Sequence, residues 1–232
     1  MGLNITSQEQ ESAFGCGKTM MAIVKRKRNP EISQARILEA AEQEFAKHGY
    51  AGARIDKIVQ RAGVSKNLVY HYFGSKDDLF LIVMECMYER MRAHHADLQI
   101  KELPPVEGME QLTRHTFRHF VEYPAVISLL NSENLTRAQH VRSSEKLPRL
   151  YATLSDLIGD LLARGEAEGV FRKGVDPQEL YITISSLGYF YLSNQHTLGA
   201  IYQTDLSEPD RIAARADHIV DVILGYLRPP EV

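Results

Sequence analysis

The sequence predicts an all-α fold, in which a small N-terminal unit of three helices precedes a larger helical body. Apolar residues recur at intervals of three and four along the chain, the spacing that gives a helix one buried face. Proline and glycine interrupt these stretches where helices would end. No stretch alternates between apolar and polar residues as a half-buried strand would, and 232 residues suffice to bury a full core.

The first helix is predicted from Asn29, as its N-cap, to Gly49. Pro30 suits the first turn because its missing N–H would have no partner there in any case. The expected buried face comprises Ile32, Ile37, Leu38, Ala41 and Phe45.

Two short helices joined by a tight turn follow. Ile55, Ile58 and Val59 give the first of them a buried face. Gly63 supplies the left-handed backbone of a sharp helix stop, and the Ser65 side chain is expected to cap the second helix. The inward residues of this second helix are Val69 and Phe73.

The opposite face of the second short helix combines hydroxyls, an amide, an imidazole and one lysine. An ordinary solvated face is rich in Glu and Lys, whereas these groups contact phosphates and base edges in a DNA major groove. The alternative is that Tyr70 or Tyr72 packs against neighbouring helices. The predicted DNA-binding residues are Arg54, Ser65, Lys66, Asn67, Leu68, Tyr70, His71, Tyr72 and Lys76.

The charge distribution supports a DNA-binding head. Residues 20–76 carry 11 Lys and Arg against 5 Asp and Glu, whereas residues 77–232 carry 15 against 23. The net charge of −3 for the whole chain conceals this division. A basic head on an acidic body orients a protein toward a duplex.

The run RILEAAEQEFAKHGY, followed by IDKIVQRAGVSKNLVYHYFGSKDDLF, resembles the N-terminal DNA-binding domain of the tetracycline-repressor (TetR) family of bacterial transcriptional regulators. Two departures stand out. Ala53 occupies a position that is usually Thr or Ser, so we expect Arg54 to supply the phosphate contact there. Leu68 occupies a position that is often Thr, and we expect it to contact a thymine methyl instead. The agreement covers residues 32–80 and includes Ala40, Ala41, Phe45, Gly49, Tyr50, Ile58, Gly63, Val64, Ser65, Lys66, Tyr70, Phe73, Ser75, Lys76 and Leu79.

A fourth helix is predicted from the Ser75 cap to about Leu98, with Asp77 and Asp78 favourable at its positive start. It begins beside the DNA through Lys76 and ends in the larger domain, so a tilt of this helix would move the reading helix. Pro104 and Pro105 then break the chain. Further helices are expected at 106–122, 124–137, 145–167, 177–200 and 208–227. The expected domains are a disordered basic tail (1–28), a helix-turn-helix DNA-binding domain (29–76) and a helical ligand-binding and dimerisation domain (77–232).

The last two helices carry apolar residues at helical spacing. The resemblance implies that they pair with a symmetry mate in a four-helix interface of a homodimer. The alternative is that these residues form a core within one chain, and some of them must serve that core instead of an interface. The candidate interface residues are Leu180, Ile184, Leu187, Tyr191, Ile212, Ala216, Ile219 and Ile223.

The resemblance also implies a cavity for a small-molecule effector, whose identity the sequence does not specify. Aromatic residues at helical spacing are equally what a helical core requires. The candidate ligand-binding residues are Phe117, Phe120, Leu130, Glu133, Asn134, Tyr151, Leu154 and Tyr189.

The residues before the first helix contain a basic cluster, Lys25 to Arg28, which is either a DNA-contacting arm or a solubilising tail. Gly15 to Thr19 imitates the end of a phosphate-binding loop. Its first glycine is replaced by Ser12 and no apolar strand precedes it, so we reject a nucleotide-hydrolysing function. Met20 and Met21 leave open whether the first 20 residues belong to the native protein.

Other functional classes lack their signals. The nine histidines are scattered without metal-site spacing, and no cofactor is implied. The two cysteines are expected to be free thiols of a reducing compartment. No apolar run approaches the roughly 20 residues of a membrane span, so we expect a cytoplasmic protein. No nucleophile and base constellation indicates an enzyme.

These observations predict a homodimer that binds double-stranded, palindromic operator DNA, represses transcription and is released by an unknown small molecule. Two alternatives remain open: an activator or corepressor-dependent regulator with the same DNA-binding head, and a helical binding module without specific DNA affinity.

Overall fold

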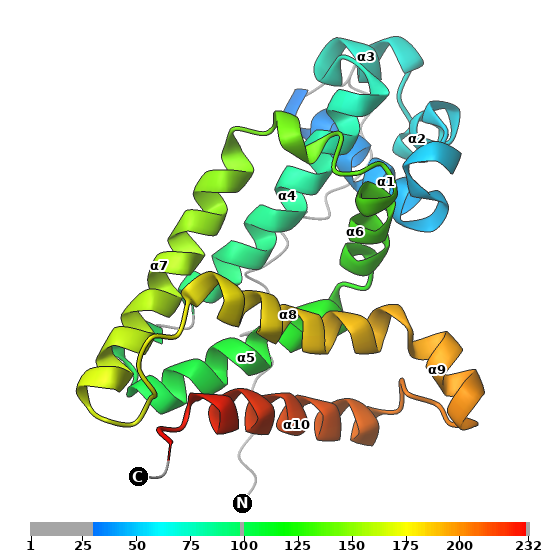
Figure 1. The fold of residues 1–232 in the computed structure, drawn as a ribbon. Coiled ribbons are helices and arrows are strands. Elements are labelled where there is room, and N and C mark those ends of the chain that lie inside the picture. The colour runs from blue at the N-terminus through cyan, green and yellow to red at the C-terminus, as the bar shows by residue number, and fades with distance from the viewer. Residues whose placement is uncertain (1–29, 98–99, 231–232) are drawn as a thin grey trace, which may run out of the picture.

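The computed structural model describes residues 30–97 and 100–230, the side chains of 93–97 excepted, and these residues form helices and no strand (Figure 1). The predicted Asn29 cap, the basic cluster at 25–28 and Cys16 lie outside them. The helices are α1 (Pro30–Gly52), α2 (Ile55–Ala62), α3 (Lys66–Phe73), α4 (Lys76–Asp97), α5 (Pro105–Glu122), α6 (Ala125–Leu135), α7 (Lys146–Ala167), α8 (Pro177–Ser193), α9 (Gln195–Tyr202) and α10 (Pro209–Leu227), with short 3₁₀ turns at Ile100–Glu102 and Val141–Ser143.

The turn between α2 and α3 forms as the sequence predicts. Gly63 adopts φ 64° and ψ 40°, and its N–H donates to the carbonyl of Val59. A side chain here would be strained by the left-handed backbone and would also meet the Arg36 guanidinium. Val69 and Phe73 are buried and fix α3 to its neighbours.

Two local predictions are wrong. Ser65 stands at the N-cap position of α3, but its side chain makes no capping hydrogen bond. It is exposed, so solvent can satisfy the free N–H groups of the first turn. Ile32 is 59% exposed, because burial on α1 begins only at Ile37, where neighbouring helices cover it.

The start of α4 is capped reciprocally by Ser75 and Asp78, which confirms the predicted cap. The Asp78 N–H donates to Ser75 Oγ at 3.1 Å, and the Ser75 N–H donates to Asp78 Oδ2 at 2.9 Å. From this cap α4 runs past α1 into the body, where it packs against α7 and α5. A single continuous helix therefore links the two parts of the molecule (Figure 1).

The body is arranged around α5, which packs against α7, α8 and α10. In Figure 1, α8 and α10 cross the lower part of the molecule one above the other, and α9 turns the chain between them. The predicted helix at 177–200 is interrupted at Asn194, whose side chain donates to the Phe190 carbonyl at 2.9 Å. The backbone of Asn194 departs from helix geometry, at φ −109° and ψ 7°, and two helices result.

None of the described helices is both long enough and apolar enough to cross a membrane. Within the same part of the chain, no three His, Cys, Asp or Glu side chains gather as metal ligands, and Cys86 is a half-buried free thiol.

Candidate DNA-binding surface and effector pocket

The outer face of α3 is polar and accessible. Lys66, Asn67 and His71 are exposed, and Tyr70 has 42% of its surface exposed. Val69 and Phe73 hold the opposite face in the core. The short helix therefore presents an amide, an imidazole, a phenol and an ammonium group on one rigid surface.

Three of the predicted DNA-binding residues are only half-exposed: Leu68, Tyr72 and Lys76. Tyr72 is partly buried and packs against the core, whereas Tyr70 is exposed, so the packing interpretation applies to Tyr72 more than to Tyr70. The Tyr72 ring also lies 5.4 Å from that of His71 and edge-on to Phe73, both on the same helix. The proposed thymine contact of Leu68 has correspondingly less surface available.

Lys66 forms an ion pair that the sequence pattern did not reveal. Its Nζ lies 3.0 Å from Asp56 Oδ1 on α2, and both side chains are exposed. The hydrogen bond with Lys66 lowers the pKa of Asp56, and the same bond raises the pKa of Lys66. The predicted contact of Lys66 with a phosphate would therefore require its ammonium group to share or leave this carboxylate.

The N-terminus of α2 receives its anion from another helix. Arg54 stands at the N-cap with an exposed side chain, and its N–H donates to Glu44 Oε1 at 3.2 Å. Glu44 is buried on α1, where its carboxylate faces the positive end of α2. The Glu44 carboxylate thus accepts an N–H at the start of α2, which is a role that a Thr or Ser side chain at position 53 would otherwise have. The Arg54 guanidinium takes no part in this bond and is exposed to solvent.

Lys76 lies against the body side of the helix-turn-helix unit. Its Nζ is 4.6 Å from the centre of the Tyr50 ring, and burial lowers the pKa of Lys76. The Tyr50 hydroxyl donates to Asp77 Oδ1. Burial, reinforced by Asp77, raises the pKa of Tyr50 to about 12, so this hydroxyl remains a donor at neutral pH.

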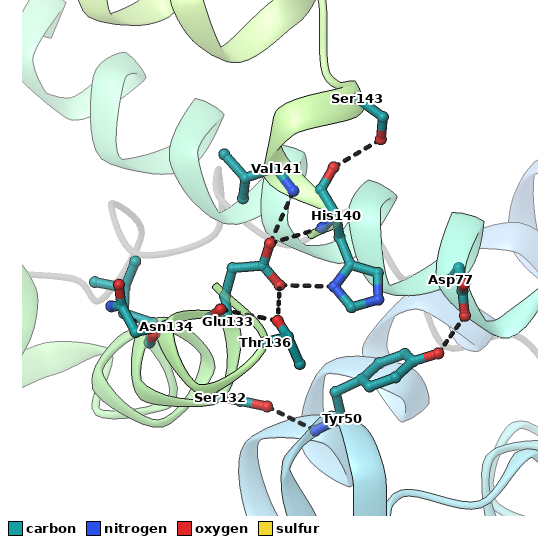
Figure 2. Close-up of polar contacts among 10 residues, drawn as sticks. Tyr50, Asp77, Ser132, Glu133, Asn134, Thr136, His140, Val141 and Ser143 are labelled. Carbon is teal, nitrogen blue, oxygen red and sulfur yellow. Dashed lines mark hydrogen bonds and ion pairs between the residues drawn. The ribbon is translucent and has the colours of Figure 1, made fainter. Parts of the chain in front are cut away.

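Tyr50 also connects the helix-turn-helix unit to α6 (Figure 2). Its backbone N–H donates to Ser132 Oγ at 2.7 Å, and its ring lies 4.3 Å from the ring of His140. His140 packs in turn against Phe80 of α4. We call Tyr50, Ser132, Glu133 and His140 the α1–α6 joint.

Glu133, a predicted ligand-binding residue, is buried in this joint and is not among the residues that line the pocket described below. Its carboxylate lies 2.7 Å from His140 Nδ1 and accepts the backbone N–H groups of His140 at 2.9 Å and Val141 at 2.8 Å (Figure 2). A buried carboxylate requires such partners. The carboxylate at position 133 is therefore explained by the turn at His140 and Val141, whose N–H groups it accepts.

A pocket of about 340 Å³ opens between α4, α5, α6, α7 and α8. The predicted residues Phe120, Leu130, Asn134, Tyr151 and Tyr189 line it, and Leu154 lines an adjoining hollow of about 320 Å³. Phe117 is buried beside Gly188 instead, because the missing side chain of this glycine lets α8 approach the ring. The lining residues that the sequence analysis missed are Tyr88, Met91, Gln178, Tyr181, Ile182, Ser185 and Ser186.

The predicted dimer residues divide into two groups. Leu180, Ile184, Ile219 and Ile223 are buried within the chain, which is the core alternative stated for these helices. The partly buried residues Leu187, Tyr191, Ile212 and Ala216 also pack against this core. The apolar side chains that α8 and α10 leave outside are Ile182, Phe190, Val222 and Tyr226.

Comparison with known proteins bears on these surfaces. A family model described as bacterial regulatory proteins of the tetR family matches residues 37–83, and one described as the tetracyclin repressor-like C-terminal domain matches residues 105–223. The HTH-type transcriptional repressor NicS of Pseudomonas putida KT2440 is 33% identical over 192 residues, which cover 83% of this chain and 91% of that protein. The chain belongs to the TetR family.

Other TetR-family relatives agree. The HTH-type transcriptional repressor SCO4008 of Streptomyces coelicolor is 55% identical over 58 residues, covering 25% of this chain and 30% of that protein. Family membership confirms the predicted helix-turn-helix and transcription regulation by DNA binding, and the names of these relatives support the repressor class. It also indicates a regulator rather than an enzyme.

Solved structures confirm the all-α fold class. A transcriptional regulator, SCO4942 from Streptomyces coelicolor, has a TM-score of 0.64 at 25% identity and covers 85% of this chain and 99% of its own. FadR from Bacillus subtilis, solved in complex with stearoyl-CoA, has a TM-score of 0.61 at 16% identity, and the match covers 84% of this chain and 100% of the FadR chain. At that identity the FadR likeness concerns the fold alone.

Proposed function

We propose that this TetR-family protein is a homodimeric repressor that binds a palindromic operator through α3 and is released by a small-molecule effector. The observation that carries the proposal is the outer face of α3, where Lys66, Asn67, Tyr70 and His71 stand clear of the core. Amide and cationic groups on a helix of this size suit the major groove. We place this function in the cytoplasm, with the DNA-binding domain ending near residue 76.

A dimer follows from the size of α3, because one short helix contacts only a few base pairs. Two copies related by a twofold axis read two half-sites about 34–36 Å apart, or somewhat more. Phe190 on α8 and Val222 and Tyr226 on α10 offer exposed apolar surface for the four-helix contact. The buried residues Leu180 and Ile219 support those faces from inside.

Release by an effector follows from the path of α4. This helix begins beside α3 and contributes Tyr88 and Met91 to the pocket, so a ligand that favours another pocket shape changes the position of α3. Moving the population from 1:99 to 99:1 requires about 5.5 kcal/mol of preference for the non-binding state. By reciprocity, operator DNA weakens ligand binding by the same factor.

Capture of genomic DNA by the full-length protein, followed by sequencing, tests the DNA-binding part. We expect a short palindrome that is lost in the Asn67→Ala and Lys66→Ala variants and retained in Lys101→Ala, which removes an exposed lysine far along the chain from α3. Enrichment that follows salt alone and ignores these substitutions would refute sequence-specific binding.

The sign of regulation needs a second measurement. A captured operator placed before a reporter gene distinguishes the repressor from the activator or corepressor-dependent alternative. Reporter expression that rises when the protein is removed supports repression. Expression that falls supports the activator.

A further inference from the structure

Arg92 of α4 lies directly behind the wall of the pocket. Its guanidinium carbon is 4.8 Å from the centre of the Tyr151 ring and 5.3 Å from that of Tyr181. Its Nη2 donates to the Tyr181 hydroxyl at 3.3 Å. Both tyrosines line the pocket and the adjoining hollow, so Arg92 is separated from the ligand space by one layer of side chains.

The guanidinium has no counter-charge in the described part of the chain. No carboxylate there lies within ion-pair distance, and its Nε and Nη1 are buried without a hydrogen-bond partner among those residues. Ser185 lines the pocket, and its Oγ is likewise buried without a hydrogen-bond partner among the described residues. Buried polar groups of this kind cost free energy until a partner satisfies them, and a buried cation is best satisfied by an anion.

The residues around this cation select the rest of the ligand. Tyr88, Tyr151, Tyr181 and Tyr189 contribute aromatic surface from three helices, and none of the described lining residues is charged. Burial raises the pKa of Tyr88 and of Tyr151, so these phenols stay neutral and repel no anion. A volume of about 340 Å³ suits a compact molecule of one or two rings.

We propose that the pocket binds a small aromatic carboxylic acid, with Arg92 as its counter-charge. The carboxylate takes the place of the Tyr181 hydroxyl beside Arg92, so the Tyr181 side chain turns aside when the ligand enters. Once the Tyr181 hydroxyl is displaced, Arg92 Nη2 and one of the two unused donors, Nε or Nη1, form the planar fork that a carboxylate matches in bidentate fashion. This inference rests on the proposed effector site and adds the chemical class of the effector. It also gives α4, through Arg92, a direct part in sensing.

Calorimetric titration of the full-length protein with matched acids and amides tests the proposal. The probes are benzoate and benzamide, 2-naphthoate and 2-naphthamide, and indole-3-acetate and indole-3-acetamide. We expect at least one acid to bind about tenfold or more tightly than its own amide, because only the acid satisfies the charge of Arg92.

Three variants identify the group responsible. Arg92→Met should abolish the preference for the acid, whereas Tyr181→Phe should keep it, since the phenol hydroxyl competes with the carboxylate. Arg149→Met is the matched control, because it removes an exposed arginine of α7 whose side chain lines neither the pocket nor the adjoining hollow. Thermal melting verifies that each variant is folded, and the acid and amide comparison on the unmodified protein needs no variant.

Equal affinity for acids and amides, or no binding of any acid in the panel, would overturn the proposal. Operator capture without acid binding would overturn this inference and leave the regulator assignment intact. Acid binding that leaves operator affinity unchanged would support the inference and refute release by the effector.

Discussion

The backbone N–H of Tyr50, at the end of α1, donates a hydrogen bond of 2.7 Å to Ser132 Oγ on α6. Tyr50 follows Gly49, whose φ of 64° turns the chain out of regular helix geometry and brings the N–H to face α6. The same helix α6 lines the pocket with Leu130 and Asn134. The pocket and the helix-turn-helix unit are therefore joined by α6 as well as by α4.

Ser132→Ala removes the acceptor of the Tyr50 N–H and leaves a partly buried donor without a partner. We expect a loss of about 1 kcal/mol in the free energy of unfolding. We also expect a smaller change in operator affinity when an effector binds, because one of the two connections is weakened. Urea denaturation and operator titrations with and without effector measure the two effects. The control is Thr153→Ala, which removes an exposed hydroxyl bonded only within α7; an equal loss in both variants would contradict the role of Ser132.

Glu133 is the centre of a buried network, and its removal should be costly. Glu133→Ala deprives the N–H groups of His140 and Val141, and the His140 ring, of their acceptor. We expect destabilisation of roughly 3 kcal/mol or more, because several buried donors lose their partner together. Glu133→Gln, which keeps one carbonyl oxygen, should lose less. A Glu133→Ala protein that unfolds within 1 kcal/mol of the unmodified one, an order-of-magnitude threshold, would show that the network contributes little.

On the proposed DNA-binding surface we expect Asp56 to weaken DNA binding in two ways, since its carboxylate repels phosphates and holds the Lys66 ammonium at 3.0 Å. Asp56→Asn should therefore tighten operator binding and steepen its dependence on salt by about one counter-ion. Lys66→Met should act in the opposite direction. Fluorescence anisotropy of labelled operator at several salt concentrations measures both slopes. An unchanged slope in Asp56→Asn would mean that Lys66 contacts no phosphate.

The local features of the DNA-binding head could be predicted from the sequence because each depends on neighbouring residues. The left-handed turn at Gly63 and the Ser75 cap follow from backbone preferences, and burial of Val69 follows from helical spacing. The Ser65 cap failed because an exposed helix start does not require a side-chain acceptor. Sequence rules state what a residue can do, and its surroundings decide whether it does so.

The pocket and the α1–α6 joint depend on which faces of distant helices pack together. No local sequence pattern predicts that packing. Glu133 was predicted to bind a ligand from its polarity among apolar residues, yet its partner is His140 across a turn. No sequence pattern distinguishes Arg92, because one arginine on a helix is ordinary until its neighbours in the fold are known to be tyrosines. Leu180 and Ile219 carry the spacing of an interface, but α5 buries them within the chain.

The Ser75 and Asp78 cap predicts a pH dependence. Hydrogen bonds from the Ser75 hydroxyl and backbone hold the pKa of Asp78 below its ordinary value of 3.8. A carboxyl group with a lowered pKa in the folded state stabilises the fold above its unfolded pKa, and that contribution is lost as the pH falls through the folded pKa. In Ser75→Ala the pKa of Asp78 should rise toward 3.8, and the stability difference from the unmodified protein should shrink below that pH. Carbon-detected NMR titration of Asp78 measures this, and an identical titration in both proteins would contradict it.

Two glycines of α7 should respond oppositely to the same substitution. A Cβ at Gly165 would lie 2.0 Å from the Phe171 ring, whereas a Cβ at Gly159 would meet only Pro177 at an ordinary 3.7 Å. Gly165→Ala should therefore destabilise the protein by about 1–3 kcal/mol, because Phe171 is buried and has little room to move. Gly159→Ala should stabilise it by up to about 1 kcal/mol through the greater helix propensity of alanine. Thermal and urea denaturation compare the two variants directly.

A double variant tests whether the Phe171 ring causes the loss in Gly165→Ala. Adding Phe171→Leu should recover part of that loss in the free energy of unfolding. A double variant whose loss exceeds the sum of the losses of the two single variants would refute this explanation.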